Sequence, residues 1–305
     1  MGLFSRKQAA ALALSPEGPY RATDTITATV TLDEALDKVT SARVELGYVN
    51  GYRYMWAGKA DATLRQGNDS WLTMDQVGTN YGSDKNTEDW VHVLDQELVV
   101  AGGVLGAGQH QVALRLPSWS PGSSKEVVRW EVRVQVERGG KDVEVSAPLT
   151  VLVAAPDPLP DLPLVQGQSA LNNTVTFEIE TERACYRPGE EVRGVVAVTP
   201  REPVTRKALL ALWFRKEQTS HPVEKNPGQT VEMFTRPMVN IVKDVQLVQG
   251  QRVEFPFAAT LPDDADPTTG AVHSSLTWWV QVKLEFSGAT GGIERAERGI
   301  VVHTA

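Results

Sequence analysis

The chain has 305 residues, of which 41% are hydrophobic and 22% charged, and its formal net charge is -8 at pH 7. This balance excludes a wholly disordered or fibrous protein, and the negative charge disfavours nucleic acid as a partner because phosphate groups would be repelled. The length exceeds what one hydrophobic core usually serves, so two domains are expected. The one cysteine, Cys185, cannot form an intramolecular disulfide, and nothing requires an oxidising compartment. We therefore expect a cytoplasmic protein.

The amino-terminal segment, residues 1–15, contains a short apolar stretch from Ala9 to Leu14. The stretch is shorter than the roughly 7 to 15 residues of a secretory signal core, and Pro16 follows at once. It predicts a turn or two of helix and no signal peptide. The segment also carries residue types of a short interfacial anchor, namely Leu3, Phe4, Arg6 and Lys7. Weak contact with a membrane surface is therefore one alternative role.

Alternation of hydrophobic and polar residues dominates the first half of the chain. In residues 25–32, the side chains of Ile26, Ala28, Val30 and Leu32 fall on one face, as in a half-buried strand. The same alternation recurs in residues 42–48, 111–116 and 130–136. Helical patterning is scarce, with a turn or two of helix expected at residues 33–38 as an insert between strands. Short strands separated by turn residues predict an all-β fold built from sandwich domains.

Residues 68–95 form the longest stretch without a regular pattern, so a loop is expected there. Its carboxylates lack the alternate-position spacing of a calcium loop, which favours a solvated acidic surface over a metal site. Long loops often carry function, and aromatic side chains commonly anchor protein partners. The loop's candidate partner-binding residues are Trp71, Tyr81 and Trp90.

A proline-rich segment divides the chain. Four prolines fall within eight residues, from Pro156 to Pro163, and proline cannot donate to a sheet ladder. Residues 155–169 are therefore expected to form a stiff linker. It would join a first sandwich at residues 16–154 to a second at residues 170–305.

The second half repeats the order of landmarks found in the first, as expected of a diverged copy. The matched landmarks, first half then second, are Tyr20 and Tyr186, Leu116-Pro117 and Leu261-Pro262, and Trp130 and Trp279. Several landmarks in one order are harder to obtain by chance than a single matched strand. The order predicts two tandem sandwiches.

The second half also resembles the arrestin-like clan, which includes arrestins, α-arrestins, the arrestin-like retromer subunit and bacterial sporulation-control proteins. The stretch that carries the resemblance is Tyr186-Arg187-Pro188-Gly189-Glu190-Glu191-Val192-Arg193-Gly194, followed later by Leu261-Pro262 and Leu276-Thr277-Trp278-Trp279. The first half departs from the pattern, with Ala22-Thr23-Asp24 in place of Pro-Gly-Glu. The resemblance implies two arrestin-like, immunoglobulin-like β-sandwiches and a role as an adaptor or scaffold.

The stretch from Lys216 to Lys243 matches the acidic loop in position but carries basic residues. A solvated strand connection is the plainer interpretation. A partner-binding surface is the functional one, with candidates Lys225, Phe234 and Arg236. The adjacent Trp278 and Trp279 must point to opposite faces of a strand.

No sequence motif indicates catalysis. The five histidines are scattered without metal-site spacing, and no nucleophile or phosphate-loop motif occurs. We expect no enzyme activity, no cofactor, no metal and no catalytic residue. The favoured function is a cytoplasmic adaptor that binds unidentified protein partners through loops and sheet edges. A carbohydrate-binding or hydrolytic sandwich is the alternative from another class, suggested by the eight tryptophans and by the acidic loop with Trp71 and Trp90, because aromatic side chains can form a platform for sugars.

Overall fold

The computed structural model describes residues 9–55, 84–159, 161–162, 164–167, 174–222, 229–288 and 292–305. The chain divides into two compact units. Unit 1 comprises Met1–Leu152 with Thr219–Gln229 and Gly270–Ser275, and unit 2 comprises Val153–Gln218, Thr230–Thr269 and Leu276–Ala305. The described residues form strands and no helix, which confirms the all-β prediction.

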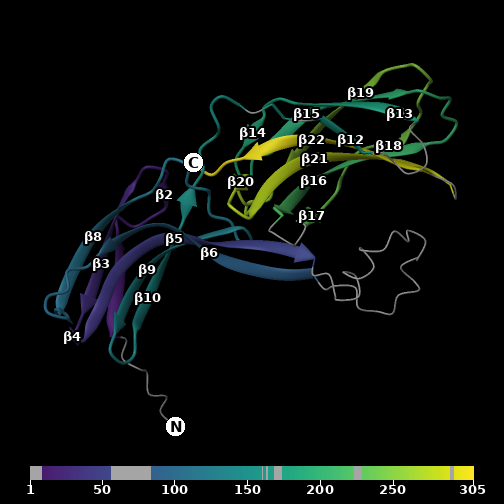
Figure 1. Ribbon diagram of the computed structural model, residues 1–305. Coiled ribbons are helices and arrows are strands. Elements are labelled where there is room, and N and C mark those ends of the chain that lie inside the picture. The colour runs from purple at the N-terminus through teal and green to yellow at the C-terminus, as the bar shows by residue number, and fades with distance from the viewer. Residues whose placement is uncertain are drawn as a thin grey trace, which may run out of the picture. The chain divides into compact units, whose positions relative to one another are not determined.

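Unit 1 is a sandwich of two antiparallel sheets (Figure 1). The three-stranded sheet has the order β1 (Ala10–Ser15), β3 (Thr25–Leu32), β8 (Gly108–Arg115). The four-stranded sheet has the order β10 (Val143–Leu149), β9 (Val128–Arg138), β5 (Val39–Met55), β6 (Asp84–Glu97). Two short pairs complete it: β2 (Tyr20–Arg21) with β11 (Val151–Leu152), and β4 (Leu36–Asp37) with β7 (Val104–Leu105).

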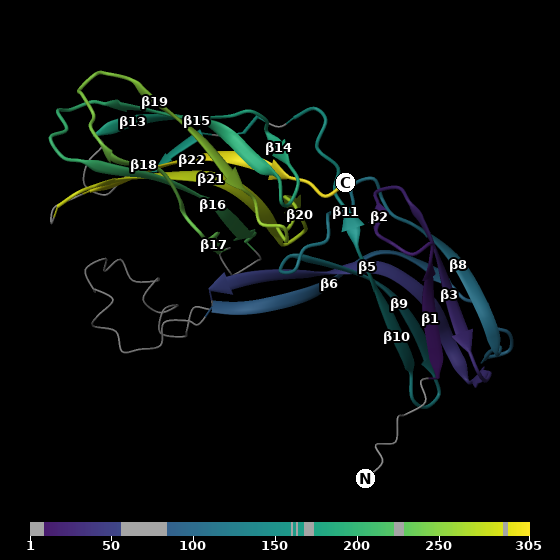
Figure 2. The ribbon, with the colours of Figure 1, turned by 180° about the vertical axis from the view of Figure 1, so that it is seen from behind.

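Unit 2 repeats this pairing order within itself (Figure 2). One sheet is β13 (Val175–Thr181), β15 (Glu191–Pro200), β19 (Val253–Thr260). The other runs β12 (Leu164–Gly167), β22 (Ile293–Val302), β21 (Ser274–Phe286), β16 (Ala208–Ser220), β17 (Thr230–Phe234). Three more strands join that sheet: β14 (Cys185–Tyr186) on β22, β18 (Val239–Val245) on β16, and β20 (Thr269–Gly270) on β21. Thus β10-β9-β5-β6 in unit 1 corresponds to β22-β21-β16-β17 in unit 2.

The core of each unit follows from period-two alternation, because successive side chains of a strand point to opposite faces. In β9, Trp130 is 1% exposed, and in β21, Trp278 is 3% exposed. Each indole N–H donates to a loop carbonyl at 2.8 Å, that of Pro121 and that of Asp266 respectively. Trp278 therefore occupies the place of Trp130, and the sequence-based match of Trp130 with Trp279 was wrong by one residue.

The first turn of each unit has the same geometry despite different residues. In unit 1 the Arg21 N–H donates to Asp24 Oδ2 at 2.7 Å, and in unit 2 the Arg187 N–H donates to Glu190 Oε2 at 2.8 Å. The residue before each acid has a positive φ, 74° at Thr23 and 77° at Gly189. Thr23 therefore stands where the family pattern has glycine.

Two helical turns expected from the sequence are wrong. Residues 10–15 form β1, which pairs with β3 in register from Ala10 opposite Leu32 to Ser15 opposite Thr27. The alanines and leucines of this segment are compatible with a strand as well as with a helix. The segment forms a strand because it pairs with the edge of β3. Part of the expected amino-terminal segment is thus sheet. At residues 33–38 the chain forms the short strand β4 instead of a helical turn.

Two expected irregular segments also contain strands. The loop expected at residues 68–95 is wrong from Asp84 onward, because Asp84–Glu97 is β6, paired with β5. Within the expected linker, Leu164–Gly167 forms β12, which pairs with β22 directly after the last proline of the segment. Proline stops a ladder only where it stands, so pairing begins once the prolines end.

Candidate functional site

A sheet edge in unit 2 that is interrupted by a turn provides the candidate site. The strands β17 and β18 pair with the same neighbour, β16, and the short turn from Thr235 to Met238 joins them. Thr235 continues the ladder, since its N–H donates to the Phe214 carbonyl at 2.9 Å. Pro237 then interrupts the edge because proline has no N–H to donate. The interruption leaves the turn as one wall of a groove.

The groove has a volume of 510 Å³ and crosses the outer face of this sheet. It is lined by Trp213, Phe234, Thr235, Arg236, Pro237, Met238 and Arg295. Trp213 faces outward because its neighbours in β16, Leu212 and Phe214, are buried in the core. The Trp213 and Phe234 rings meet edge to face, with centroids 6.0 Å apart. We call these seven residues the β16–β17 groove.

The floor of the β16–β17 groove is apolar and open to water. The side chain of Phe234 is 50% exposed and that of Met238 is 40% exposed, and both lie beside Trp213. Adjacent large apolar side chains on one concave surface are a common mark of an interaction site. A second hollow of 360 Å³ shares Trp213 and the turn and reaches residues 258–260 of β19.

Both charged side chains that line the groove are arginines, Arg236 and Arg295, and both are exposed. Neither takes part in an ion pair within the described part of the chain. The positive charge at the groove is therefore available to a partner.

The nearby carboxylates are committed to a different arginine. Arg215 is 4% exposed in its side chain and pairs with Glu217, Glu232 and Glu297, the Glu232 pair at 3.0 Å. Its guanidinium lies 5.2 Å from the ring centroid of Trp279. Burial alone would lower the pKa of Arg215, but the hydrogen bonds that its guanidinium donates to Glu217 and Glu297 outweigh burial and raise that pKa above its ordinary value. Arg215 therefore stays charged and keeps these three acids in ion pairs.

The predicted partner-binding residues are only partly brought together. Phe234 and Arg236 both line the β16–β17 groove. Trp71, Tyr81 and Lys225 lie outside the described residues.

Trp90 belongs to unit 1 and is packed on its sheet. The Arg133 guanidinium lies 3.6 Å from the centroid of the Trp90 ring. A Cβ placed on Gly47 would lie 2.6 Å from Trp90 Cζ2, so the ring lies directly against that glycine. Trp90 therefore covers the outer face of β5 and β9 and does not project as a free anchor.

Sequence reasoning named two of the seven groove residues and missed five, of which Trp213, Met238 and Arg295 contribute the largest side chains. Trp213 could have been found from the sequence, because it lies between two core positions of a strand and its side chain must therefore point to the outer face of the sheet. Met238 lies four residues after Phe234, in the stretch already singled out. Arg295 had no signal, since only the sheet order brings β22 near the turn.

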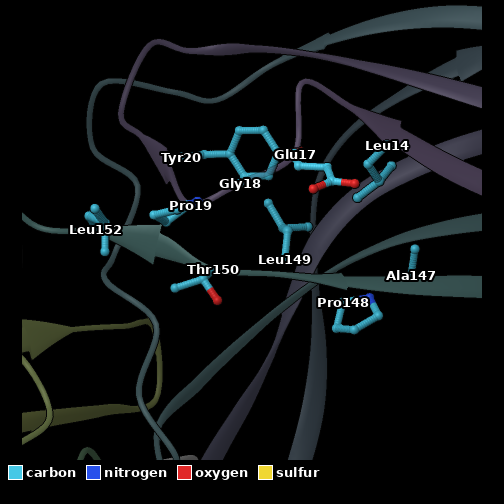
Figure 3. Close-up of a pocket in the computed structure, with 10 residues that line it drawn as sticks. All are labelled: Leu14, Glu17, Gly18, Pro19, Tyr20, Ala147, Pro148, Leu149, Thr150 and Leu152. Atoms are coloured by element: carbon cyan, nitrogen blue, oxygen red, sulfur yellow. The ribbon is translucent and has the colours of Figure 1, made fainter. Parts of the chain in front are cut away.

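A second groove lies in unit 1, with a volume of 710 Å³ (Figure 3). Leu14, Leu149 and the Tyr20 ring surround it, and Glu17 is its one charged lining residue. The Tyr20 hydroxyl donates to the Pro16 carbonyl at 2.5 Å, which holds the ring in place. None of the strongly exposed large hydrophobic side chains of the described residues lines this groove. It is the weaker candidate for docking a partner.

Within the described residues, no group of three or more His, Cys, Asp or Glu side chains is arranged to hold a metal ion. The same part of the chain contains no helix with the length and hydrophobicity needed to span a membrane.

Comparison with known proteins gives likenesses among solved structures. No family model matches the chain, and no curated protein matches it. Among the solved structures it resembles is Spo0M, a sporulation control protein from Bacillus subtilis, at 20% sequence identity and a TM-score of 0.35. The match covers 44% of this chain and 51% of that chain, so it spans about half the length of Spo0M.

Proposed function

We propose that this protein is an adaptor that binds another protein, and that the β16–β17 groove receives an extended segment of that partner. The observation that carries the proposal is the pair of exposed apolar side chains, Phe234 at 50% and Met238 at 40%, set beside Trp213 in one groove. Other strongly exposed apolar side chains, such as Trp119 and Val248, do not line it.

The physical basis is the cost of leaving such a surface in water. Covering apolar surface contributes about 25 cal/mol for each Å² removed from water. Interfaces obtain most of their free energy from a few central aromatic and large apolar side chains. Phe234 and Met238 can supply this contribution without rearranging the core, because Leu212 and Phe214 hold β16 in place from the inner face.

A protein-binding role also fits the structure better than the sugar-binding alternative. That alternative depended on open aromatic rings at Trp71 and Trp90. The Trp90 ring carries Arg133 at 3.6 Å and lies against Gly47, which leaves less ring surface for a sugar to stack on.

The test is selection of ligands from a random library of twelve-residue peptides displayed on phage, with the full chain as bait. We expect enriched peptides whose affinity falls about tenfold or more in Phe234→Ala and in Met238→Ala, the effect of losing one central anchor. The control variants are Trp119→Ala, 61% exposed, and Val248→Ala, 60% exposed, which should bind as the parent does. Enriched peptides that bind the Phe234 and Met238 variants unchanged would refute this site, as would a selection that enriches nothing.

A further inference from the structure

The proposed function does not say which kind of peptide segment the groove binds. The charged side chains at the groove indicate the chemistry of that segment. Resting on that function, we infer that the bound segment is acidic: an apolar side chain lies among Trp213, Phe234 and Met238, and carboxylates on either side of it pair with Arg236 and Arg295.

The charge balance of the lining carries this inference. Arg236 and Arg295 are the two charged residues among the seven that line the groove, so its lining has a charge of +2 with no acid to offset it. This is a local reversal in a chain whose net charge is -8. A basic partner would be repelled here, and a neutral one would leave both guanidinium groups unpaired.

The surrounding acids cannot neutralise these arginines without leaving existing partners. Glu217, Glu232 and Glu297 all pair with the buried Arg215. Each of these acids is already paired with the buried guanidinium, so moving one of them to the groove would break an existing ion pair. Glu191, which lines the adjoining hollow, likewise pairs with Arg193, so these acids of the described residues are already in ion pairs and we infer that a partner supplies the carboxylates for Arg236 and Arg295.

The sheet order sets the spacing of those carboxylates. Arg295 lies on β22 and Arg236 directly follows β17, with β21 and β16 between them. Three interstrand steps of about 4.8 Å separate the two backbones by roughly 14 Å, which an extended chain covers in about four residues. The flexible arginine side chains can adjust to small differences in this spacing. Two acids about four residues apart, one two residues before the apolar residue and one two residues after it, therefore fit best. The fork geometry of arginine suits paired contacts with carboxylates.

The experiment uses the peptides selected on the full chain. We expect them to be enriched in Asp and Glu around a central apolar residue. The tightest selected peptide is then synthesised with its acids as Glu, Gln or Lys, and its affinity is measured by fluorescence anisotropy at low and high salt. Each of Arg236→Gln and Arg295→Gln should weaken the Glu peptide about two- to fivefold, as expected for an exposed ion pair, and leave the Gln peptide unchanged.

Matched controls separate this inference from the proposed function. Lys243→Gln removes an exposed cation of β18 that does not line the groove, and Glu17→Gln alters the groove of unit 1. Both should leave the affinity unchanged. The double variant Arg236→Glu, Arg295→Glu should prefer the Lys peptide.

Four results would overturn the inference. Selected peptides with no excess of acids, or Glu and Gln peptides bound equally while Phe234→Ala abolishes binding, would refute the acidic partner and leave the docking groove standing. Peptide binding that is unchanged in Phe234→Ala would refute both the docking groove and the acidic partner. Sedimentation with phosphatidylserine vesicles that depends on Arg236 and Arg295, with no peptide selected, would replace the acidic peptide by an anionic lipid surface.

Discussion

The first turn of each unit should respond to glycine and alanine substitutions with opposite signs. Thr23 and Gly189 both have a φ near 75°, the left-handed region, and their N–H groups donate to a carbonyl of a Leu-Pro pair, that of Leu116 and that of Pro262 respectively. A side chain with a Cβ is disfavoured in that region by about 1 to 2 kcal/mol, and a β-branched one most of all. Unit 1 bears this cost at Thr23, and unit 2 avoids it with Gly189.

The expected magnitudes follow from two opposing effects. Thr23→Gly removes the strain but makes the unfolded chain more flexible, which costs about 0.5 to 1 kcal/mol. We expect a net gain in the free energy of unfolding of about 0.5 to 1 kcal/mol. Gly189→Ala adds the strain and places a Cβ 2.7 Å from Asp263 Oδ1, so that carboxylate must move. A loss of about 1 to 2 kcal/mol is expected.

The assay is urea unfolding, with hydrogen exchange of the strands in each unit to assign the change to that unit. Gly250→Ala is the control for backbone strain, because Gly250 has a φ of 73° and a Cβ added there would meet nothing within 4 Å. Its smaller loss, subtracted from that of Gly189→Ala, gives the cost of moving Asp263. A destabilised Thr23→Gly protein would show that the reasoning about this turn is wrong.

Three further predictions concern packing and the thiol. Gly47→Ala would place a Cβ 2.4 Å from a backbone carbonyl oxygen and 2.6 Å from the Trp90 ring. We expect the free energy of unfolding, measured in urea, to fall by about 1 to 3 kcal/mol. A fall of less than about 0.5 kcal/mol would contradict this packing. Trp130→Phe and Trp278→Phe should each cost about 1 to 3 kcal/mol, because each removes a buried N–H donor to a carbonyl at 2.8 Å; equal stability to the parent would disprove the shared role. Burial raises the pKa of the Cys185 thiol, so its reaction with dithionitrobenzoate should be slower than in the urea-unfolded chain. The reaction rate should still increase above about pH 8.5, the ordinary pKa of a cysteine thiol. A rate that reaches its plateau below that pH would refute the raised pKa.

The sequence predicted those strands that bury one whole face. In β3 and β9 every second side chain is buried, so period two is visible in the residues themselves. In β6 no described side chain from residue 86 to 97 is fully buried, because β6 is an edge strand. A strand without a buried face shows no alternation, and its charged residues imitate a loop.

The candidate site was predictable only where it is local in sequence. Phe234 and Arg236 were found because an aromatic and a basic residue stand together in one short stretch. Arg295 enters through the order of strands in the sheet, which no local pattern encodes. Trp90 was a candidate by residue type, and only the contacts with Arg133 and Gly47 show that its ring is already used in packing.

The most direct test of the docking groove is hydrogen exchange of the full chain with and without the tightest selected peptide. We predict slower exchange in residues 208–218 and 230–245, which carry β16, β17 and β18, and unchanged exchange in residues 143–152 of unit 1. Protection confined to residues 143–152, beside the groove of Figure 3, or no protection of β16 to β18 at saturating peptide, would contradict the account.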